Sequence, residues 1–106
     1  MPGIDLNHFI KQANKLTAQI EKRKASLADE TVEGKAGDGL VVATANGVQE
    51  LKSLKIDPKA IDPNDTAMLE DLVTAAVNAA LAASRDHMQK ELSKISNGIP
   101  IPGVTR

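Results

Sequence analysis

Apolar residues between positions 6 and 27 recur every seven positions, the spacing of a helix that packs along a partner helix. One heptad position holds Leu6, Ala13, Ile20 and Leu27, and the position three residues later holds Phe9 and Leu16. Asp5 can cap the first turn, because its carboxylate can accept a hydrogen bond from a free backbone amide there. The pattern therefore predicts a helix over residues 5–28, roughly 35 Å long at ~1.5 Å per residue.

The pattern changes between residues 29 and 57 to short β-prone runs separated by glycine. Asn46-Gly47 predicts a tight hairpin, since a type I′ turn needs positive φ at both central residues. Gly37-Asp38-Gly39 predicts the other turn, and turn chemistry also accounts for Gly34. We expect a three-stranded antiparallel meander over residues 31–57. Because three strands alone are marginal, a helix should cover one face.

A second long periodic segment is predicted over residues 65–96, after the capping residues of Asp62-Pro63-Asn64-Asp65. Its first half is apolar on more than one face, and its alanines permit close helix packing. Its second half is polar apart from Met88, Leu92 and Ile95, as in a projecting, paired helix. Asn97-Gly98 stops the helix and the proline-containing residues 97–106 form a flexible tail. The prediction is an α+β fold in one domain, residues 1–106: helix, three-stranded antiparallel meander, long helix.

Composition favours a dimer. With 106 residues, one Phe and neither Trp nor Tyr, the chain has few large side chains for a core. A lone chain of this size buries only about two-thirds of the surface exposed on unfolding. We therefore expect a homodimer with projecting helices, either intertwined or side by side. The absence of cysteine fits the cytoplasm, and we expect neither an export leader nor a membrane span.

Enzyme chemistry is not indicated by the sequence. His8 and His87 lie on different helices and are interpreted as solvated. Glu70-Asp71 suits the helix dipole near an N-terminus. The glycines near residue 37 lack the Gly-Lys-Ser/Thr of a phosphate-binding loop. We expect no catalysis, no cofactor, no metal and no small-molecule substrate.

Charge is unevenly distributed along the chain. The formal net charge is −1, but residues 5–27 carry five bases and two acids, a local charge of +3. His8, Lys11, Lys15 and Lys22 share one stripe of the first helix, opposite its heptad positions. Further bases in this helix and in the distal second helix are Arg23, Lys24, Arg85, Lys90 and Lys94. On charge alone, a solvated helix face explains either cluster and is favoured over a DNA contact.

The order of motifs resembles the YbaB/EbfC family over nearly the whole chain. The motifs are Lys11-Gln12-Ala13, the stretch Gly34-x-x-Gly37-x-Gly39-Leu40-Val41, Asn46-Gly47, Ile56-Asp57-Pro58, the run from Met68 to Ala80, and Pro102-Gly103. The chain departs from the family in its short N-terminal segment and in Arg23, which occupies an apolar heptad position.

The resemblance implies a homodimeric nucleoid-associated protein in the cytoplasm and nucleoid. Such a protein binds double-stranded DNA with low sequence preference, helps to organise the nucleoid and influences gene expression. Combining this with the charge pattern, we hypothesise that the principal DNA contacts are Lys11, Lys15, Lys22, Arg23 and Lys24, with Arg85, Lys90 and Lys94 as secondary ones. By the resemblance, the core and dimer residues are Leu69, Leu72, Val73, Ala76, Asn78 and Ala80. Asn78 would form hydrogen bonds inside this region; the alternative for Asn78 is simple solvent exposure.

An alternative function is a dimeric adaptor that binds another protein and touches DNA only incidentally. Residues 28–64 carry seven acids and four bases, so this region should repel DNA and could meet a basic protein.

Overall fold

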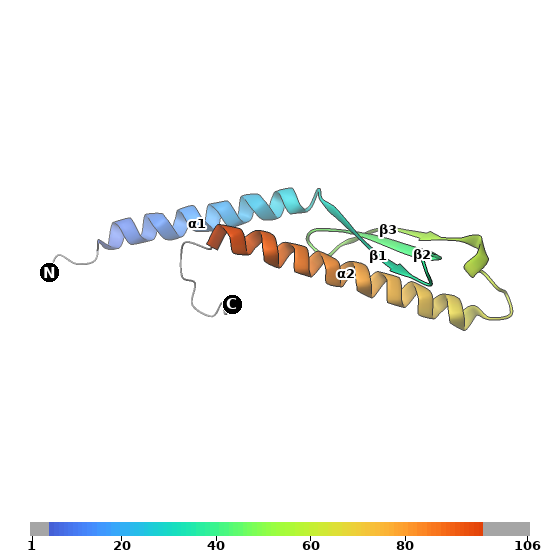
Figure 1. Cartoon of the computed structure of the whole chain (residues 1–106). Coiled ribbons are helices and arrows are strands. Elements are labelled where there is room, and N and C mark those ends of the chain that lie inside the picture. Colours follow the sequence, from blue (N-terminus) through green and yellow to red (C-terminus); the bar gives the residue numbers. More distant parts are fainter. Residues whose placement is uncertain (1–4, 97–106) are drawn as a thin grey trace.

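The computed structural model describes residues 5–96 and has the predicted order of helix, three-stranded sheet and long helix (Figure 1). The elements are α1 (Leu6–Leu27), β1 (Thr31–Ala36), β2 (Val41–Asn46), β3 (Leu51–Ile56), the 3-10 turn η1 (Pro58–Ala60) and α2 (Thr66–Ser96). The α+β fold class is confirmed. The predicted tail, residues 97–106, lies outside the described residues.

Both long helices begin at aspartate caps. The Asp5 carboxylate accepts a hydrogen bond from the backbone N–H of His8 at 3.2 Å. Asp65 accepts one from the backbone N–H of Met68 at 3.1 Å. Each cap satisfies an amide that has no partner within the helix, so the local sequence fixes where α1 and α2 start.

The sheet is an antiparallel meander in the order β1-β2-β3, and α2 lies across β1 and β2. Ala43 of β2 is paired with Gly34 of β1 and with Leu54 of β3, so these three residues share the face toward α2. The core between sheet and helix consists of the fully buried Val41, Ala43, Ala45, Ala60, Ala76 and Ala80. It is built mostly from small side chains, which bring α2 close to the sheet.

Gly34 serves close packing and not a turn, which corrects the sequence interpretation. It lies inside β1 and is buried beneath α2. A Cβ atom at this position would lie 2.2 Å from the backbone nitrogen of Ala80 and 2.5 Å from the carbonyl oxygen of Ala76. Only glycine therefore lets the backbone of α2 rest directly on β1.

The β2–β3 connection is longer than the predicted two-residue turn. Neither Asn46 nor Gly47 has positive φ; that conformation falls on Gln49, at 62°. The side-chain oxygen of Asn46 instead accepts hydrogen bonds from the backbone amides of Val48 and Glu50, both at 3.0 Å. Gly47 donates its amide to the carbonyl of Leu27, 2.9 Å away. The loop is thus docked on the end of α1, and this contact overrides the local turn preference.

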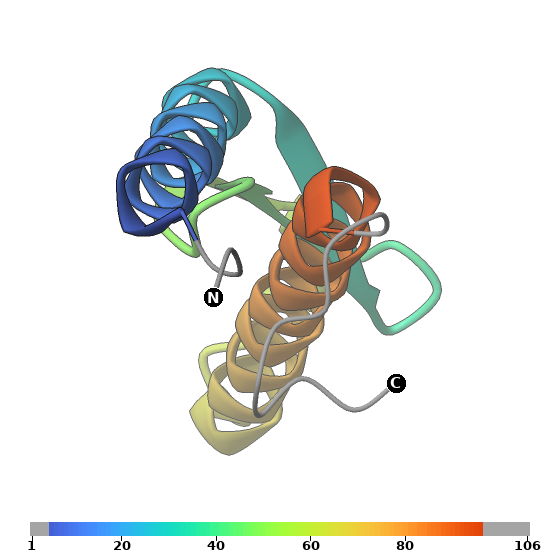
Figure 2. The ribbon, with the colours of Figure 1, turned by 90° about the vertical axis from the view of Figure 1, so that its left-hand side faces the viewer.

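The molecule is elongated. Its extents are 77 × 24 × 16 Å and its radius of gyration is 20.2 Å, against about 13 Å for a compact domain of this length. Helix α1 runs antiparallel to the C-terminal half of α2, and its N-terminal half projects beyond Ser96 (Figures 1 and 2). Leu6 and Phe9 on this projecting half are 64% and 67% exposed. Part of the predicted heptad pattern is therefore uncovered in the single chain.

Helix α2 is long and apolar enough, by length and composition, to cross a membrane, although no such span was expected from the sequence. The relevant 18-residue window has a mean hydropathy of 1.2, and 11% of it is buried. The buried line of α2 consists of Ala76, Ala80 and Ser84, which pack on the sheet. We therefore interpret α2 as the core helix of the fold, with a second apolar face that the single chain leaves uncovered.

Candidate nucleic-acid interface

The basic stripe of α1 comprises His8, Lys11, Lys15 and Lys22, all of which are exposed. Among residues 5–96, none of these three lysines takes part in an ion pair. Lys11 and Lys15 lie on the projecting half of α1, away from the sheet (Figure 1). The stripe therefore presents free ammonium groups on a rigid rod, accessible to a large ligand.

Arg23 differs from the lysines, because its charge is already paired. Its guanidinium donates to Glu30 at 2.7 Å, on the segment before β1, and to Glu91 of α2 at 2.7 Å. Glu91 also pairs with Lys94 at 2.7 Å. These contacts tie α1 to α2, so the structure places Arg23 in a link between helices and not on the free stripe.

The pKa values of this network reflect its hydrogen bonds. Lys94 first, and Arg23 second, lower the pKa of Glu91 to about 2. Arg23, followed by His87, lowers the pKa of Glu30, and Glu30 does most to raise the pKa of Arg23. Both carboxylates are therefore ionised at neutral pH and form charge-assisted hydrogen bonds with Arg23 and Lys94.

His87 is not merely solvated, which corrects the sequence interpretation. Its Nε2 lies 2.8 Å from Oε1 of Glu30, and the histidine side chain is only 33% exposed. The sequence signal for this network was Arg23 itself. A charged residue at an apolar heptad position points to a carboxylate on the facing helix, but it does not identify which one.

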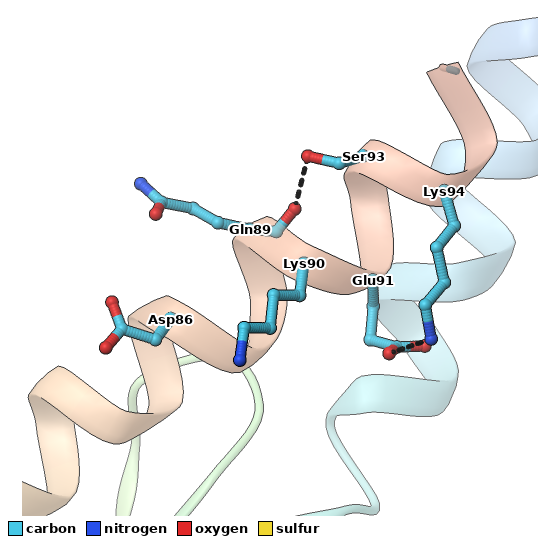
Figure 3. A pocket seen from close by; sticks show the side chains of 6 residues that line it. All are labelled: Asp86, Gln89, Lys90, Glu91, Ser93 and Lys94. Atoms are coloured by element: carbon cyan, nitrogen blue, oxygen red, sulfur yellow. Dashed lines mark hydrogen bonds and ion pairs between the residues drawn. The ribbon is translucent and has the colours of Figure 1, made fainter. Parts of the chain in front are cut away.

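The remaining predicted DNA contacts point in several directions. Lys24 is exposed but lies two residues from Lys22, about 200° around the helix at ~100° per residue. Arg85 and Lys90 are exposed on α2. In Figure 3, Lys94 turns toward Glu91, whereas Lys90 extends away from this pair. The structure therefore does not gather the eight predicted bases into one surface.

Of the predicted core and dimer residues, five belong to the core of the single chain and one, Asn78, does not. Ala76 and Ala80 are fully buried, and Leu69, Leu72 and Val73 pack against the core. Asn78 is exposed in the single chain, so it does not hydrogen-bond inside this core as expected. A contact between Asn78 and a second subunit remains a prediction.

Ser84 is a structural residue that the sequence interpretation missed. Its buried hydroxyl donates to the carbonyl of Asn46 at 2.6 Å and accepts the backbone amide of Gln49 at 2.9 Å. Ser84 thereby fixes α2 to the β2–β3 loop. Serine within a helix carries no sequence signal for such a contact, because its partner is 38 residues away.

Two open depressions on the described part of the surface are lined mainly by residues with polar or charged side chains. The one in Figure 3 is lined by residues of α2 alone: Asp86, Gln89, Lys90, Glu91, Ser93 and Lys94. A second lies between α1 and α2 and is lined by Gln19, Lys22, Arg23, Ser26, Lys94 and Ile95. Within residues 5–96, no three His, Asp or Glu side chains are placed to share a metal ion.

Comparison with known proteins identifies relatives over the whole chain. A family model described as the YbaB/EbfC DNA-binding family matches residues 1–99. A nucleoid-associated protein of Myxococcus xanthus is 70% identical, over 99% of this chain and 100% of its own. A nucleoid-associated protein of Anaeromyxobacter dehalogenans is 48% identical, over 95% and 98% respectively. The fold is shared with an uncharacterised protein of Helicobacter pylori, at a TM-score of 0.75 and 20% identity, covering 92% of this chain and all of that one.

Proposed function

The chain belongs to the YbaB/EbfC DNA-binding family, and from this premise we propose that it binds duplex DNA as a homodimer with low sequence preference. The observation that supports this most directly is the basic stripe of exposed lysines on α1, which make no ion pair within residues 5–96 and of which Lys11 and Lys15 lie on the projecting half. Its proposed role is to coat DNA in the cytoplasmic nucleoid and so to organise it and influence gene expression. The names of the relatives support this location.

The geometry of the stripe suits phosphate contacts. Lys11, Lys15 and Lys22 recur at spacings of four and seven residues, which places their ammonium groups along one line of the helix. Phosphates attract lysines electrostatically whatever the neighbouring bases are, so such contacts carry no sequence information. Within residues 5–96 no Arg/Asn-rich recognition helix of the familiar base-reading kinds is evident. Low sequence preference follows from this composition.

A homodimer is supported by two uncovered apolar regions. The first is the projecting half of α1, with Leu6, Phe9 and Ile10. The second surrounds β3 and the start of α2, and consists of Leu51, Leu54, Ile61 and Met68, which are 38–55% exposed. Because Leu54 belongs to the sheet face toward α2 and α2 hardly reaches β3, a second subunit has an apolar face to cover.

We expect sedimentation equilibrium to give twice the 11.2 kDa chain mass at micromolar concentration. Replacing Leu54 and Met68 with aspartate should shift the equilibrium toward monomer, because each change would bury an unpaired carboxylate in the contact. The control variant carries Lys52→Asp and Glu70→Gln, two changes at exposed positions. It should have the same mass in solution as the wild type. A wild-type monomer at all concentrations would contradict the dimer.

The DNA proposal is tested by fluorescence anisotropy with a generic duplex of about 30 base pairs across a salt series. Two stripes of three lysines would neutralise about six phosphates, which gives a log-log slope of about −5 for affinity against salt. Random duplexes should compete almost equally well. Binding that is absent at low salt, or indifferent to salt, would contradict the proposal.

Failure of DNA binding would favour the adaptor function. The same uncovered residues, Leu51, Leu54, Ile61 and Met68, would then face a different protein. A partner retained at stoichiometric amounts in high salt would support that alternative, since DNA contacts are lost under those conditions.

A further inference from the structure

A basic groove separates the second half of α1 from the C-terminal end of α2. Three of its six lining residues are cationic: Lys22 and Arg23 from α1, and Lys94 from α2. Gln19 and Ser26 add polar groups to the same walls. The helices meet where Arg23 contacts Glu91, 68 residues later in the sequence. They therefore form one open site with hydrogen-bond donors on both sides.

Glu91 lies against this cluster of cations and partly neutralises it. One carboxylate oxygen accepts from Arg23 at 2.7 Å, and the other accepts from Lys94 at 2.7 Å. A phosphate group would make the same kind of contact, with one oxygen on a guanidinium and another on an ammonium. Glu91 is 17% exposed, whereas Lys94 is 70% exposed and Lys22 is unpaired among the described residues. Lys22 and Lys94 can therefore turn toward a ligand from solvent.

We propose that this groove binds a phosphate group of nucleic acid and that Glu91 weakens the binding by competing for its cations. The inference rests on the proposed DNA-binding function. It adds to the basic stripe a second phosphate contact, which Glu91 weakens. The groove lies beside the stripe, because Lys22 belongs to both. A backbone phosphate can enter it while Lys11 and Lys15 hold neighbouring phosphates on the projecting half.

The charge of the groove decides the expected effect. Its three cations face two carboxylates, Glu91 and Glu30, that bond to Arg23. Glu91→Gln keeps the size and a hydrogen-bond acceptor but removes one negative charge from each subunit. A charge within about 5–8 Å of a phosphate at a solvated surface changes affinity by a few-fold, and a dimer presents two grooves.

The test is the affinity of the Glu91→Gln dimer for the generic duplex, measured by anisotropy across the salt series. We expect about tenfold tighter binding at low salt and a log-log slope steeper by one to two. Glu70→Gln is the matched control, since it removes the same charge from the same helix, about 30 Å away at ~1.5 Å per residue. Glu70 is exposed and makes no ion pair within residues 5–96.

Equal tightening in Glu70→Gln would overturn the proposal, because the effect would then come from net charge. Weaker or unchanged binding in Glu91→Gln, with a thermal midpoint within a few degrees of wild type, would also overturn it. In that case Glu91 would be only a tie between the helices. Wild-type binding with the predicted salt slope would leave the broader DNA function intact in either case, whereas absent wild-type binding would refute both.

A double-mutant cycle locates the effect. Lys22→Gln should cost several-fold more affinity in the Glu91→Gln background than in wild type, since Lys22 then contributes to an open groove. An additive result would contradict the proposed site.

A chemical-shift titration distinguishes nucleic-acid phosphate from free phosphate as the ligand. Its readout is the backbone amide shifts of residues 19–26 and 91–95. Shifts with both duplex and inorganic phosphate indicate a general phosphate site, and shifts with duplex alone indicate a nucleic-acid site. Shifts with neither would overturn the proposal.

Discussion

Replacing Lys11, Lys15 and Lys22 with alanine is expected to weaken duplex binding by at least about 100-fold at 0.1 M salt. In a homodimer the change removes six ammonium groups. The salt slope of about 0.9 per phosphate makes each full contact worth roughly eightfold at 0.1 M relative to 1 M salt, so the loss of even two or three of the six contacts reaches about 100-fold. The log-log salt slope should fall from about −5 toward zero. The fold should be unaffected, because all three side chains are exposed and unpaired within residues 5–96. Anisotropy titration with the generic duplex measures both quantities.

The sheet offers a control with an identical change of charge. Lys35, Lys52 and Lys55 are also exposed, but they lie on β1 and β3. Their triple alanine variant should retain most of the affinity and salt slope. Equal losses in the two variants would mean that overall charge, and not the α1 stripe, attracts DNA. Full binding by the α1 variant would show that DNA contacts a surface other than the α1 stripe.

Gly34→Ala is expected to cost about 3 kcal/mol or more of unfolding free energy, a large share of the stability of a domain this size. Its new Cβ atom would lie 2.2 Å from the backbone nitrogen of Ala80. A backbone atom cannot rotate away as a side chain can, so α2 must lift from the sheet and open the core around Ala43 and Ala76. Urea unfolding monitored by circular dichroism should show a clearly lower midpoint.

Gly39→Ala separates this steric effect from the loss of glycine flexibility. Gly39 has a φ of +90° and open space around its Cβ position. Its substitution should cost only about 1 kcal/mol, the price of placing a Cβ in left-handed backbone. If Gly34→Ala proved as mild as Gly39→Ala, the close contact between β1 and α2 would not be a main source of stability.

Local sequence was sufficient to place the elements. Asp5 and Asp65 cap the helices because their carboxylates reach amides within three residues. Heptad spacing and the β-prone run of β2 likewise depend on neighbours along the chain. The stripe of Lys11, Lys15 and Lys22 follows from helical geometry alone, so it could be identified before the fold was known.

Contacts between distant segments decided the rest. From the sequence, Gly34 resembles a turn residue. Its packing role becomes evident only from its contact with α2, more than 40 positions later in the chain. Asn46-Gly47 has the composition of a type I′ turn, but docking on Leu27 and Ser84 selects a longer loop. Arg23 could be counted among the DNA-binding bases only while Glu30 and Glu91 were unplaced. Sequence determined the helices, the strands and the free lysines because these depend on short-range geometry. Tertiary structure decided which glycine is a packing site and which base is already paired, because those properties depend on what the folded chain brings alongside.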